Sequence, residues 1–573
     1  MYYLRPMRSL IYDRDISGWR LFRDPEDILT ADNPEEVLPV LEAVDAAARS
    51  GFYAVGYVSY EAAEGLDASL SHHDAEPGLP LVQFGLYRAS EPGVVASNVE
   101  VDLQLAPVMS RGDYHRALED IRRYLRQGDT YQVNYTHRLK GEAQQDPADV
   151  FAALVRAQPS NYAAMIDVGN FVICSVSPEL FFEMADGRIS TEPMKGTRPR
   201  GRHPEEDEWL RQALADSAKD RSENLMIVDM IRNDLGRIAE PGSVKVDELF
   251  RIRRLPTVWQ QVSNVSARTG VTLAEVFLAL FPCASVTGAP RHRTMEIIQE
   301  LESSPRGIYT GAIGMVGPGG RARFSVAIRT LVLDRRTGSA TYGTGGGIIW
   351  DSAAEDEWQE SLIKAEILRG GRPPFQLLET MRFEPETGID RLDAHLRRLK
   401  ASGDYFGYPI DLRAITDRLR QIETDTPLRL RMLIAEDGTM TIEEHPLGPF
   451  PEIVRLKLAS EPVCHSDVFL YHKTTCRHVY EAARGEDDDC DDVILWNEAG
   501  ELTETTISNL YLEIDAELLT PGRDAGLLAG TYRQMMLTEG RAKETTLTKA
   551  DLKRASRLFV SNGVRGLVPA VLV

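Results

Sequence analysis

The chain has 573 residues, of which 43% are apolar and 27% are charged, a composition typical of a globular protein. At roughly 150 residues per domain this length predicts two to four domains and excludes a small disulfide-stapled scaffold. Lys and Arg number 65 against 87 Asp and Glu, which gives a formal charge of −22. That sign disfavours a protein that holds nucleic acid or an anionic membrane through its overall field.

The cysteines and the N-terminal residues indicate the compartment. The 5 cysteines are odd in number and none lies in a C-x-x-C pair, so neither a disulfide framework nor a thiolate zinc site is predicted. The first residues carry charges where a signal peptide needs an apolar core, and no uncharged apolar run reaches about 18 residues. We therefore expect a cytoplasmic protein with no membrane span.

Three segments predict regular structure along the first part of the chain. FVICSV (residues 171–176) is rich in β-branched and aromatic residues and predicts a strand. DRSENLMIVDMIRNDLGRI (residues 220–238) predicts a helix, with Asp220 and Glu223 as its capping box. Its apolar stripe, spaced three and four apart, consists of Leu225, Val228, Ile231, Leu235 and Ile238. ARFSVAIRTLVL (residues 322–333) predicts a further strand.

A cluster of Gly and Pro marks the expected domain boundary. EILRGGRPPF (residues 366–375) places two glycines and two prolines within five positions and predicts a linker. We expect one domain over residues 1–370 and a second over residues 371–573.

The segment TEPMKGTRPRG (residues 191–201) places Lys195 between a proline and Gly196, which predicts a tight turn that presents the amine to a ligand. Lysines in Gly- and Pro-rich turns are usually solvent-exposed, so the segment alone is only weak evidence for a functional lysine. GTGGG (residues 343–347) lacks the further glycine of a dinucleotide fingerprint, and no GxxxxGK[ST], HExxH or GxSxG occurs. The common nucleotide, zinc-protease and serine-hydrolase signatures are therefore absent from the sequence.

Residues 50–365 carry a series of motifs in a fixed order. They are GDTYQVNYT (128–136), SPELF (177–181), PMKGTRPRG (193–201), DRSENLMIVDMIRNDLGR (220–237), SVTGAPRHRTMEII (285–298), YTGAIGM (309–315), SVAIRT (325–330), GTGGGI (343–348) and DEWQES (356–361). By these motifs the region resembles the chorismate-utilising enzymes, and within them component I of aminodeoxychorismate synthase. The resemblance implies an α+β fold, a sandwich with large antiparallel sheets around a buried site, and it implies Mg²⁺.

The resemblance implies roles for several carboxylates. By their positions in the motifs, Glu223 and Glu360 match the Mg²⁺ ligands, and a divalent ion held there can bridge to a substrate carboxylate. The alternative is that Glu223 only caps its helix; both roles can coexist, and the matched motif favours the ligand. Glu179 matches the general acid that protonates the departing C4 hydroxyl, a task that needs a raised pKa.

A second set of motif residues matches the substrate-binding positions of the family. Tyr309 and Arg329 match the residues that hold a ring carboxylate, although a strand arginine is also typical of a solvated edge. The further matching positions are Ser285 and the glycine turn of Gly345, Gly346 and Gly347, whose backbone amides can approach the substrate closely.

Three positions bear on which branch of the family this sequence resembles. Gln132 stands where water-adding enzymes carry a lysine base, and a glutamine cannot take a proton from water. Lys195 stands where anthranilate synthases have a small alanine. The resemblance implies that the Lys195 amine adds at ring C2 and that ammonia then enters at C4. Gln260 departs from the family, which often has a histidine there, and this puts leaving-group stabilisation in doubt.

Residues 375–573 resemble fold-type IV pyridoxal phosphate (PLP) enzymes, also called aminotransferase class IV, and within them aminodeoxychorismate lyases. The matching motifs are LLETMR (377–382), LDAHLRRL (392–399), YHKTTCRHVYEAAR (471–484), ELTETTISNLYL (501–512), GLLAGTYR (526–533) and SNGVRGLVP (561–569). The resemblance implies an α/β domain. The region is shorter than typical members and lacks the first hairpin, so either the first domain covers that edge or the site is incomplete.

The PLP-site residues follow from the same resemblance. Lys473 matches the lysine that binds the cofactor covalently and moves the proton, and Glu504 matches the partner of the pyridine nitrogen. Arg398 would pair with the phosphate, although its helix is also a plausible amphipathic surface. The other expected phosphate-binding positions are Ile507, Ser508, Gly530 and Thr531.

Together the two resemblances imply para-aminobenzoate synthesis from chorismate and ammonia, with Mg²⁺ and PLP. A separate glutamine amidotransferase subunit is expected to supply the ammonia, and a homodimer through the PLP region is compatible with the fold type. One alternative is an anthranilate synthase component joined to an amino-acid transaminase. Another is an inactive chorismate-binding scaffold for an amidotransferase.

Overall fold

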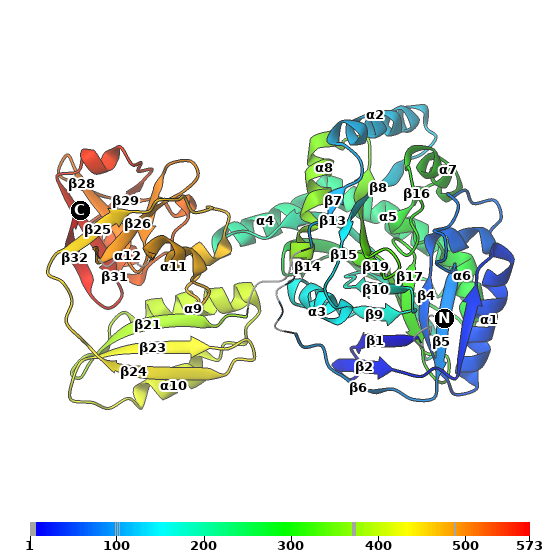
Figure 1. Cartoon of the computed structure of the whole chain (residues 1–573), viewed down its shortest axis with the longest axis horizontal. Helices are drawn as coiled ribbons and strands as arrows, with labels where there is room; N and C mark the ends of the chain where they lie inside the picture. The colour runs from blue at the N-terminus through cyan, green and yellow to red at the C-terminus, as the bar shows by residue number, and fades with distance from the viewer. Residues whose placement is uncertain (1–6, 98, 100, 102, 370–373, 486–488) are drawn as a thin grey trace. The chain divides into compact units, whose positions relative to one another are not determined.

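The computed structural model of the chain describes residues 7–97, 99, 101, 103–369, 374–485 and 489–573 (Figure 1). It forms two compact units, each with its own core. The first unit comprises Met1–Pro199 and Arg211–Arg372, and the second comprises Arg200–Leu210 and Pro373–Val573. Four residues of the predicted linker, 370–373, lie outside the described residues.

Two large sheets make up the first unit. Within the described residues one sheet has the strand order β16-β8-β20-β19-β10-β9-β1-β2-β6, with β7 paired to β8. Its strands are β16 (Gly288–Ala289), β8 (Gln132–Glu142), β20 (Ser339–Ile348), β19 (Thr330–Asp334), β10 (Phe171–Ser175), β9 (Ala164–Asp167), β1 (Arg8–Asp13), β2 (Gly18–Phe22), β6 (Glu91–Gly93) and β7 (Ala106–Pro107). Every pairing in this sheet is antiparallel.

The second sheet of this unit has the order β13-β15-β12-β11-β18-β17-β4-β5-β3, with β14 paired to β15. Its strands are β13 (Met194–Pro199), β15 (Val258–Arg268), β12 (Arg188–Glu192), β11 (Leu180–Ala185), β18 (Ala322–Val326), β17 (Ala312–Val316), β4 (Tyr53–Val58), β5 (Val82–Tyr87), β3 (Asp27–Ala31) and β14 (Lys245–Arg254). All of these pairings are also antiparallel.

Helices of the first unit pack against its sheets. They are α1 (Pro34–Arg49), α2 (Arg111–Gln127), α3 (Pro147–Ala157), α5 (Ala218–Gly236), α6 (Leu273–Leu280), α7 (Arg291–Leu301) and α8 (Ala354–Ile363). Helix α4 (Pro204–Asp216) begins in the part of the chain that belongs to the second unit and ends in the first. One core lies between the sheets and joins Ile11 and Ile173 of the first to Val55 and Ile313 of the second. A larger core packs α1, α5 and α6 on the second sheet, and α3 covers the first sheet. The expected α/β sandwich with antiparallel sheets is confirmed.

The second unit contains two sheets of different size. The smaller has the order β22-β21-β23-β24 and carries helices α9 (Leu392–Phe406) and α10 (Leu412–Arg420), which pack on it through an apolar core. Its strands are β21 (Leu377–Glu384), β22 (Gly388–Ile389), β23 (Leu428–Ile434) and β24 (Met440–Pro446). Figure 1 shows β21, β23 and β24 side by side.

The larger sheet has the order β27-β26-β25-β32-β31-β28-β29-β30, and a β27–β28 pairing closes six of its strands into a barrel. Its strands are β25 (Val454–Leu458), β26 (Asp492–Trp496), β27 (Leu502–Thr505), β28 (Asn509–Ile514), β29 (Glu517–Pro521), β30 (Lys543–Thr545), β31 (Arg557–Asn562) and β32 (Gly566–Leu572). Helices α11 (His478–Arg484) and α12 (Thr531–Thr538) complete this part.

Residues Arg200–Leu210 belong to the second unit although they lie within the sequence of the first. The Arg200 guanidinium pairs with Asp207 at 2.7 Å, donates to the Tyr405 carbonyl at 3.1 Å and stacks over the Tyr405 ring at 4.4 Å. The Tyr405 hydroxyl in turn donates to the Gly201 carbonyl at 2.7 Å. The second unit is therefore built from two separate stretches of the chain.

Two details of the predicted helix and strands are wrong. Helix α5 begins at Ala218, and the Ser217 side chain caps it by accepting from the Asp220 N–H, so Asp220 and Glu223 do not form a capping box. Residues 322–333 form two strands, β18 and β19, rather than one. Arg329 separates them with a φ of 50°, which breaks the extended backbone.

Candidate active sites

The first unit contains a cavity of about 180 Å³ between the ends of its sheets and helices. Ten of the predicted site residues line it: Glu179, Lys195, Glu223, Ser285, Tyr309, Arg329, Gly345, Gly346, Gly347 and Glu360. Lys195 comes from β13, Glu223 from α5, Glu360 from α8 and the glycines from β20. Residues from eight separate motifs therefore meet in one place.

Lys195 lies in a strand and not in the tight turn that its Gly and Pro neighbours predict. The pairing of β13 with β15 shifts register between Met194 and Thr197, and Gly196 supplies a φ of 91° within this bulge. Gln260 holds the bulge, because its amide donates to the Gly196 carbonyl at 2.9 Å and it accepts from the Thr197 hydroxyl at 3.1 Å. The bulge aims the lysine into the cavity.

Burial controls the charge of Lys195. Burial lowers the pKa of the Lys195 amine, and the carboxylates of Glu223 and Glu179 oppose that shift. An added Cβ on Gly347 would lie 2.7 Å from Lys195 Nζ and 2.8 Å from Gln132 Nε2. Gln132 is fully buried, does not line the cavity itself, and neither atom of its amide has a hydrogen-bond partner within the described residues. The amine, the Gln132 amide and the bare Gly347 backbone therefore share one small space.

Glu179 has the environment of a general acid. Burial raises the pKa of its carboxyl to about 7, and the Ser285 hydroxyl donates to its Oε1 at 2.6 Å. A carboxyl with this pKa is protonated for a large fraction of the time at neutral pH and can give up a proton.

The two predicted metal ligands differ in their surroundings. Burial raises the pKa of Glu223 to about 7, because only more distant amines compensate its charge. Glu360 pairs with Lys364 at 2.8 Å, and this pairing lowers its pKa although burial opposes the shift. Glu357, three residues before Glu360 on α8, also lines the cavity, and burial and Glu360 raise its pKa. Glu357 was missed by sequence reasoning, although its i, i+3 spacing to Glu360 was a usable signal.

Among the described residues, no group of three or more His, Cys, Asp or Glu side chains is arranged to hold a metal ion. Mg²⁺ usually keeps several waters and takes only one or two protein carboxylates together with its substrate. Glu223 and Glu360 both line the cavity and fit that pattern, and a cation there would compensate the charge of the half-buried Glu223.

The glycines of residues 345–347 lie in strand β20 and not in the expected turn. They pair with β8, and Gly345 lies opposite Thr136. A Cβ on Gly345 would come within 2.2 Å of the Tyr135 carbonyl, so the strand itself requires glycine there. The Tyr309 ring packs under Gly343 in the same strand, and Arg329 donates to the side chain of Gln158. These contacts hold Tyr309 and Arg329 at the cavity wall.

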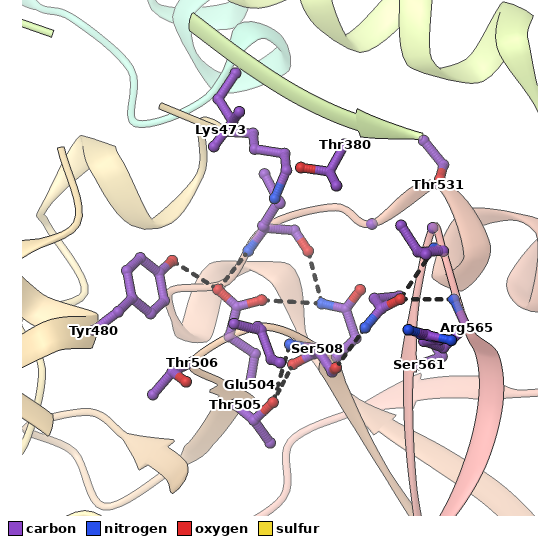
Figure 2. Close-up of a pocket in the computed structure, with 18 of the residues that line it drawn as sticks. Thr380, Lys473, Tyr480, Glu504, Thr505, Thr506, Ser508, Thr531, Ser561 and Arg565 are labelled. Carbon is purple, nitrogen blue, oxygen red and sulfur yellow. Dashed lines mark hydrogen bonds between the residues drawn. The ribbon is translucent and has the colours of Figure 1, made fainter. Parts of the chain in front are cut away.

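The second unit contains a cavity of about 450 Å³, drawn in Figure 2. All seven predicted cofactor-binding residues line it: Arg398, Lys473, Glu504, Ile507, Ser508, Gly530 and Thr531. Burial and the nearby Arg398 cation lower the pKa of Lys473 to about 8. The amine is therefore neutral for part of the time at neutral pH.

Glu504 projects from barrel strand β27 and is held from three sides. The Tyr480 hydroxyl donates to it at 2.9 Å, Asn509 Nδ2 donates at 3.1 Å and the Leu528 N–H donates at 3.2 Å (Figure 2). Burial nevertheless raises its pKa to about 8. A buried carboxyl with these properties fits a basic ring nitrogen as its partner.

The same cavity also offers hydrogen-bond donors to an anion. Gly530 caps the N-terminus of α12, which begins at Thr531, and Ser508 lines the cavity as well. Arg398 binds Glu379 through two hydrogen bonds of 2.8 and 2.6 Å, and His395 binds the same carboxylate at 2.7 Å. Burial opposes the shift, but Arg398 and His395 hold the pKa of Glu379 at about 2. Glu379, which sequence reasoning missed, fixes the orientation of Arg398, and the residue set fits PLP.

Two family matches cover most of the chain. Residues 90–370 match the chorismate binding enzyme family, and residues 376–573 match the amino-transferase class IV family. No helix within the described ranges combines the length and apolar character needed to cross a membrane.

Individual relatives align with the first region. Aminodeoxychorismate synthase component 1 of Klebsiella aerogenes is 44% identical over 258 residues, which are 45% of this chain and 57% of that protein. Anthranilate synthase component 1 3 of Haloarcula marismortui is 43% identical over 253 residues, 44% of this chain and 50% of that protein. The chain spans about half the length of the curated relatives it matches.

A solved structure shows the same fold. Anthranilate synthase component I from Streptococcus pneumoniae superposes with a TM-score of 0.52 at 24% identity, over 64% of this chain and 90% of that one. With the two family matches, the chain joins a chorismate binding enzyme domain to an amino-transferase class IV domain.

Proposed function

We propose that the first unit aminates chorismate at C4 to give 4-amino-4-deoxychorismate. The observation that carries this proposal is the buried Lys195 amine, with its lowered pKa, in one cavity with Glu179. A lowered pKa enlarges the neutral, nucleophilic fraction of the Lys195 amine, and a carboxyl of pKa about 7 is an acid. Nucleophile and acid together support a displacement in which a hydroxyl leaves as water.

The proposed step balances as follows. The Lys195 nitrogen forms a bond to ring C2, both ring double bonds shift by one position, and the C4–O bond breaks as Glu179 protonates the departing oxygen. Ammonia then forms a bond to C4, both double bonds shift back, and the lysine leaves C2. The surplus proton on nitrogen returns to the Glu179 carboxylate. Lys195 and Glu179 are thereby restored, and the nitrogen enters at the para position.

Glu223 and Glu360 would hold Mg²⁺ in this cavity. The metal would supply Lewis acidity and a bridge to a substrate carboxylate. Arg329 and Tyr309 would bind a ring carboxylate, and the bare backbone at Gly346 and Gly347 leaves space for the ring beside Lys195.

We further propose that the second unit eliminates pyruvate from this product and releases 4-aminobenzoate, a precursor for folate. PLP would serve as the electron sink that makes the proton on the amine-bearing carbon acidic. Lys473 would remove that proton, after which the ether C–O bond breaks, pyruvate leaves and the ring becomes aromatic. Glu504 would hold the ring nitrogen of the cofactor, and Gly530, Thr531, Ser508 and Arg398 would surround its phosphate.

Ammonia would come from a separate glutamine amidotransferase subunit. We expect the protein to act in the cytoplasm. A homodimer through the PLP unit is compatible with this fold type. The similarity to relatives named as aminodeoxychorismate synthase component 1 supports the first activity. Relatives named as anthranilate synthase are equally similar, so the product of the reaction has to decide between them.

The test is mass spectrometry of the purified chain incubated with chorismate, ammonium, Mg²⁺ and PLP. We expect 4-aminobenzoate from the native protein, aminodeoxychorismate from Lys473→Ala and neither product from Lys195→Ala. Anthranilate from the native protein would refute the role of Lys195. Aminodeoxychorismate without 4-aminobenzoate would refute the lyase step alone. If no product forms even after a glutamine amidotransferase subunit and glutamine are added, the protein is not a synthase.

A further inference from the structure

The cavity of the second unit carries far more positive charge than a cofactor phosphate needs. Five arginines and Lys473 line it, whereas Glu504 is its one acidic lining residue among those described. The arginines are Arg398, Arg429, Arg431, Arg477 and Arg565. The whole chain has a net charge of −22, so this excess of cations is local and runs against the overall composition.

Some of these cations already have protein partners. Arg398 is paired with Glu379, and Arg431 is paired with Glu443 at 3.0 Å. Arg477 donates to the Thr506 carbonyl at 2.6 Å and stacks over the Tyr480 ring at 4.6 Å.

Arg429 and Arg565 are different. No ion pair joins either of them to a carboxylate in the part of the chain that the structure describes. Arg565 donates to the Gly448 carbonyl at 2.6 Å and lies over the Phe450 ring at 5.0 Å. Both contacts orient its guanidinium and neither neutralises it.

The strand register places a further positive charge beside them. Arg429 of β23 lies directly opposite Arg382 of β21, and like charges at directly opposite positions destabilise a sheet. Arg382 has Glu384 as a partner at 2.5 Å, so the charge left uncompensated is that of Arg429. Burial lowers the pKa of Arg565, and Arg382 and Arg429 lower it further, so the three guanidinium groups interact.

The turn that carries Arg565 is hydrogen-bonded to Ser508, one of the expected phosphate-binding residues. Asn562 Oδ1 accepts from the N–H groups of Val564 and Arg565 at 3.0 and 2.9 Å, and its Nδ2 donates to Ser508 Oγ at 3.1 Å. Figure 2 shows Arg565 and Ser561 across the pocket from Tyr480. The guanidinium is therefore mounted on a rigid turn and is not a loose surface group.

We infer that Arg429 and Arg565 form a carboxylate subsite that takes the second carboxylate of a dicarboxylate substrate. This inference rests on the proposed function of the second unit, whose substrate carries one carboxylate on the ring and one on the enolpyruvyl ether. An ordinary monocarboxylate amino acid has no second carboxylate and would leave this subsite empty. The subsite therefore favours a dicarboxylate lyase substrate over the substrate of a simple amino-acid transaminase.

The test uses the full-length chain loaded with PLP and two probes that lack an amine. 3-(Carboxymethoxy)benzoate carries a ring carboxylate and an ether-linked carboxylate, and 3-methoxybenzoate carries only the first. Their dissociation constants are measured by calorimetry for the native protein, Arg429→Gln and Arg565→Gln. The control is Arg418→Gln, which removes the same charge from an exposed position on α10. Lysine substitutions at 429 and 565 keep the charge and test whether it suffices.

We expect each glutamine variant to weaken binding of the dicarboxylate about tenfold or more, since a charge-assisted hydrogen bond is lost. The dissociation constant of the monocarboxylate for these variants should stay within about twofold of the native value, and so should those of both probes for the control variant. Native-like dicarboxylate binding by Arg429→Gln and Arg565→Gln would overturn the inference, and so would equal losses for the two probes. Because binding needs no turnover, a protein that binds as expected but releases no pyruvate would refute the lyase step and leave the subsite standing.

Discussion

Substitution of Gly347 by alanine tests whether the strand backbone makes room for the Lys195 amine. The added Cβ would lie 2.7 Å from Lys195 Nζ and 2.8 Å from Gln132 Nε2, whereas ordinary contact begins near 3.4 Å. Both atoms are at the ends of flexible side chains, so the fold can absorb the methyl group. The amine must then move by about 0.7 Å, and a displacement of that size in a reacting group costs on the order of 100-fold in rate.

The assay measures kcat/KM for chorismate amination with ammonium, together with the thermal unfolding midpoint. We expect Gly347→Ala to lose about 100-fold in kcat/KM with a midpoint close to that of the native protein. Two further glycine variants serve as comparisons. Gly345→Ala places its Cβ 2.2 Å from the Tyr135 carbonyl and should unfold at lower temperature, and Gly236→Ala meets nothing within 4 Å and should change neither quantity. Full amination activity in Gly347→Ala would refute the proposed position of the reacting amine.

Three further predictions concern the second unit. Burial lowers the pKa of Lys473 to about 8, so the amine is mostly protonated below that pH and mostly neutral above it. The rate of PLP uptake, measured by absorbance, should therefore rise up to about pH 8 and then level off. A rate that keeps rising to pH 10 would contradict this prediction. Glu504→Gln should retain PLP but release pyruvate about 100-fold more slowly or worse, and an unchanged rate would exclude Glu504 as the partner of the ring nitrogen. Arg200→Ala breaks a buried ion pair with Asp207 and should lower the free energy of unfolding of the second unit by about 3 kcal/mol. Calorimetry of the full chain measures this loss. A loss confined to the first unit would contradict the assignment of residues 200–210 to the second.

The residue types at the two sites could be predicted from the sequence, but their backbone settings could not. Lys195 was expected in a turn because Gly and Pro flank it, yet it lies in a bulged strand. Neighbouring Gly and Pro residues indicate an irregular backbone, but they do not distinguish a turn from a bulge. That difference depends on pairing with β15, which lies more than 60 residues away in sequence. The glycines of residues 345–347 were misassigned for the same reason.

Contacts between distant segments account for the other differences. Leu225 belongs to the predicted apolar stripe of α5 but is 45% exposed, whereas Ile227, outside the stripe, is fully buried. The periodicity identified the helix, but its rotation is set by packing against the sheet. Likewise Glu379 appears in the sequence only as a charge in an apolar strand, and its pairing with Arg398 and His395 depends on how α9 lies on β21.

The proposed substrates of the two cavities are both dicarboxylates, but the two cavities differ in charge, and this makes metal removal informative. Five cations and five carboxyl groups line the described part of the first cavity, so in formal charge its side chains offer much less attraction for a dicarboxylate than those of the second cavity. A divalent cation on Glu223 and Glu360 would supply the missing charge. The second cavity has six cations against one carboxyl group among the described residues and needs no metal.

Chelation with EDTA should therefore abolish amination of chorismate, and added Mg²⁺ should restore it. Pyruvate release from supplied aminodeoxychorismate should continue at the native rate under the same conditions. Loss of both activities on chelation would show that the arginine-rich cavity does not hold the substrate unaided. Retention of both would mean that the first cavity binds its substrate without a divalent ion, and the positions of Glu223 and Glu360 would then require another explanation.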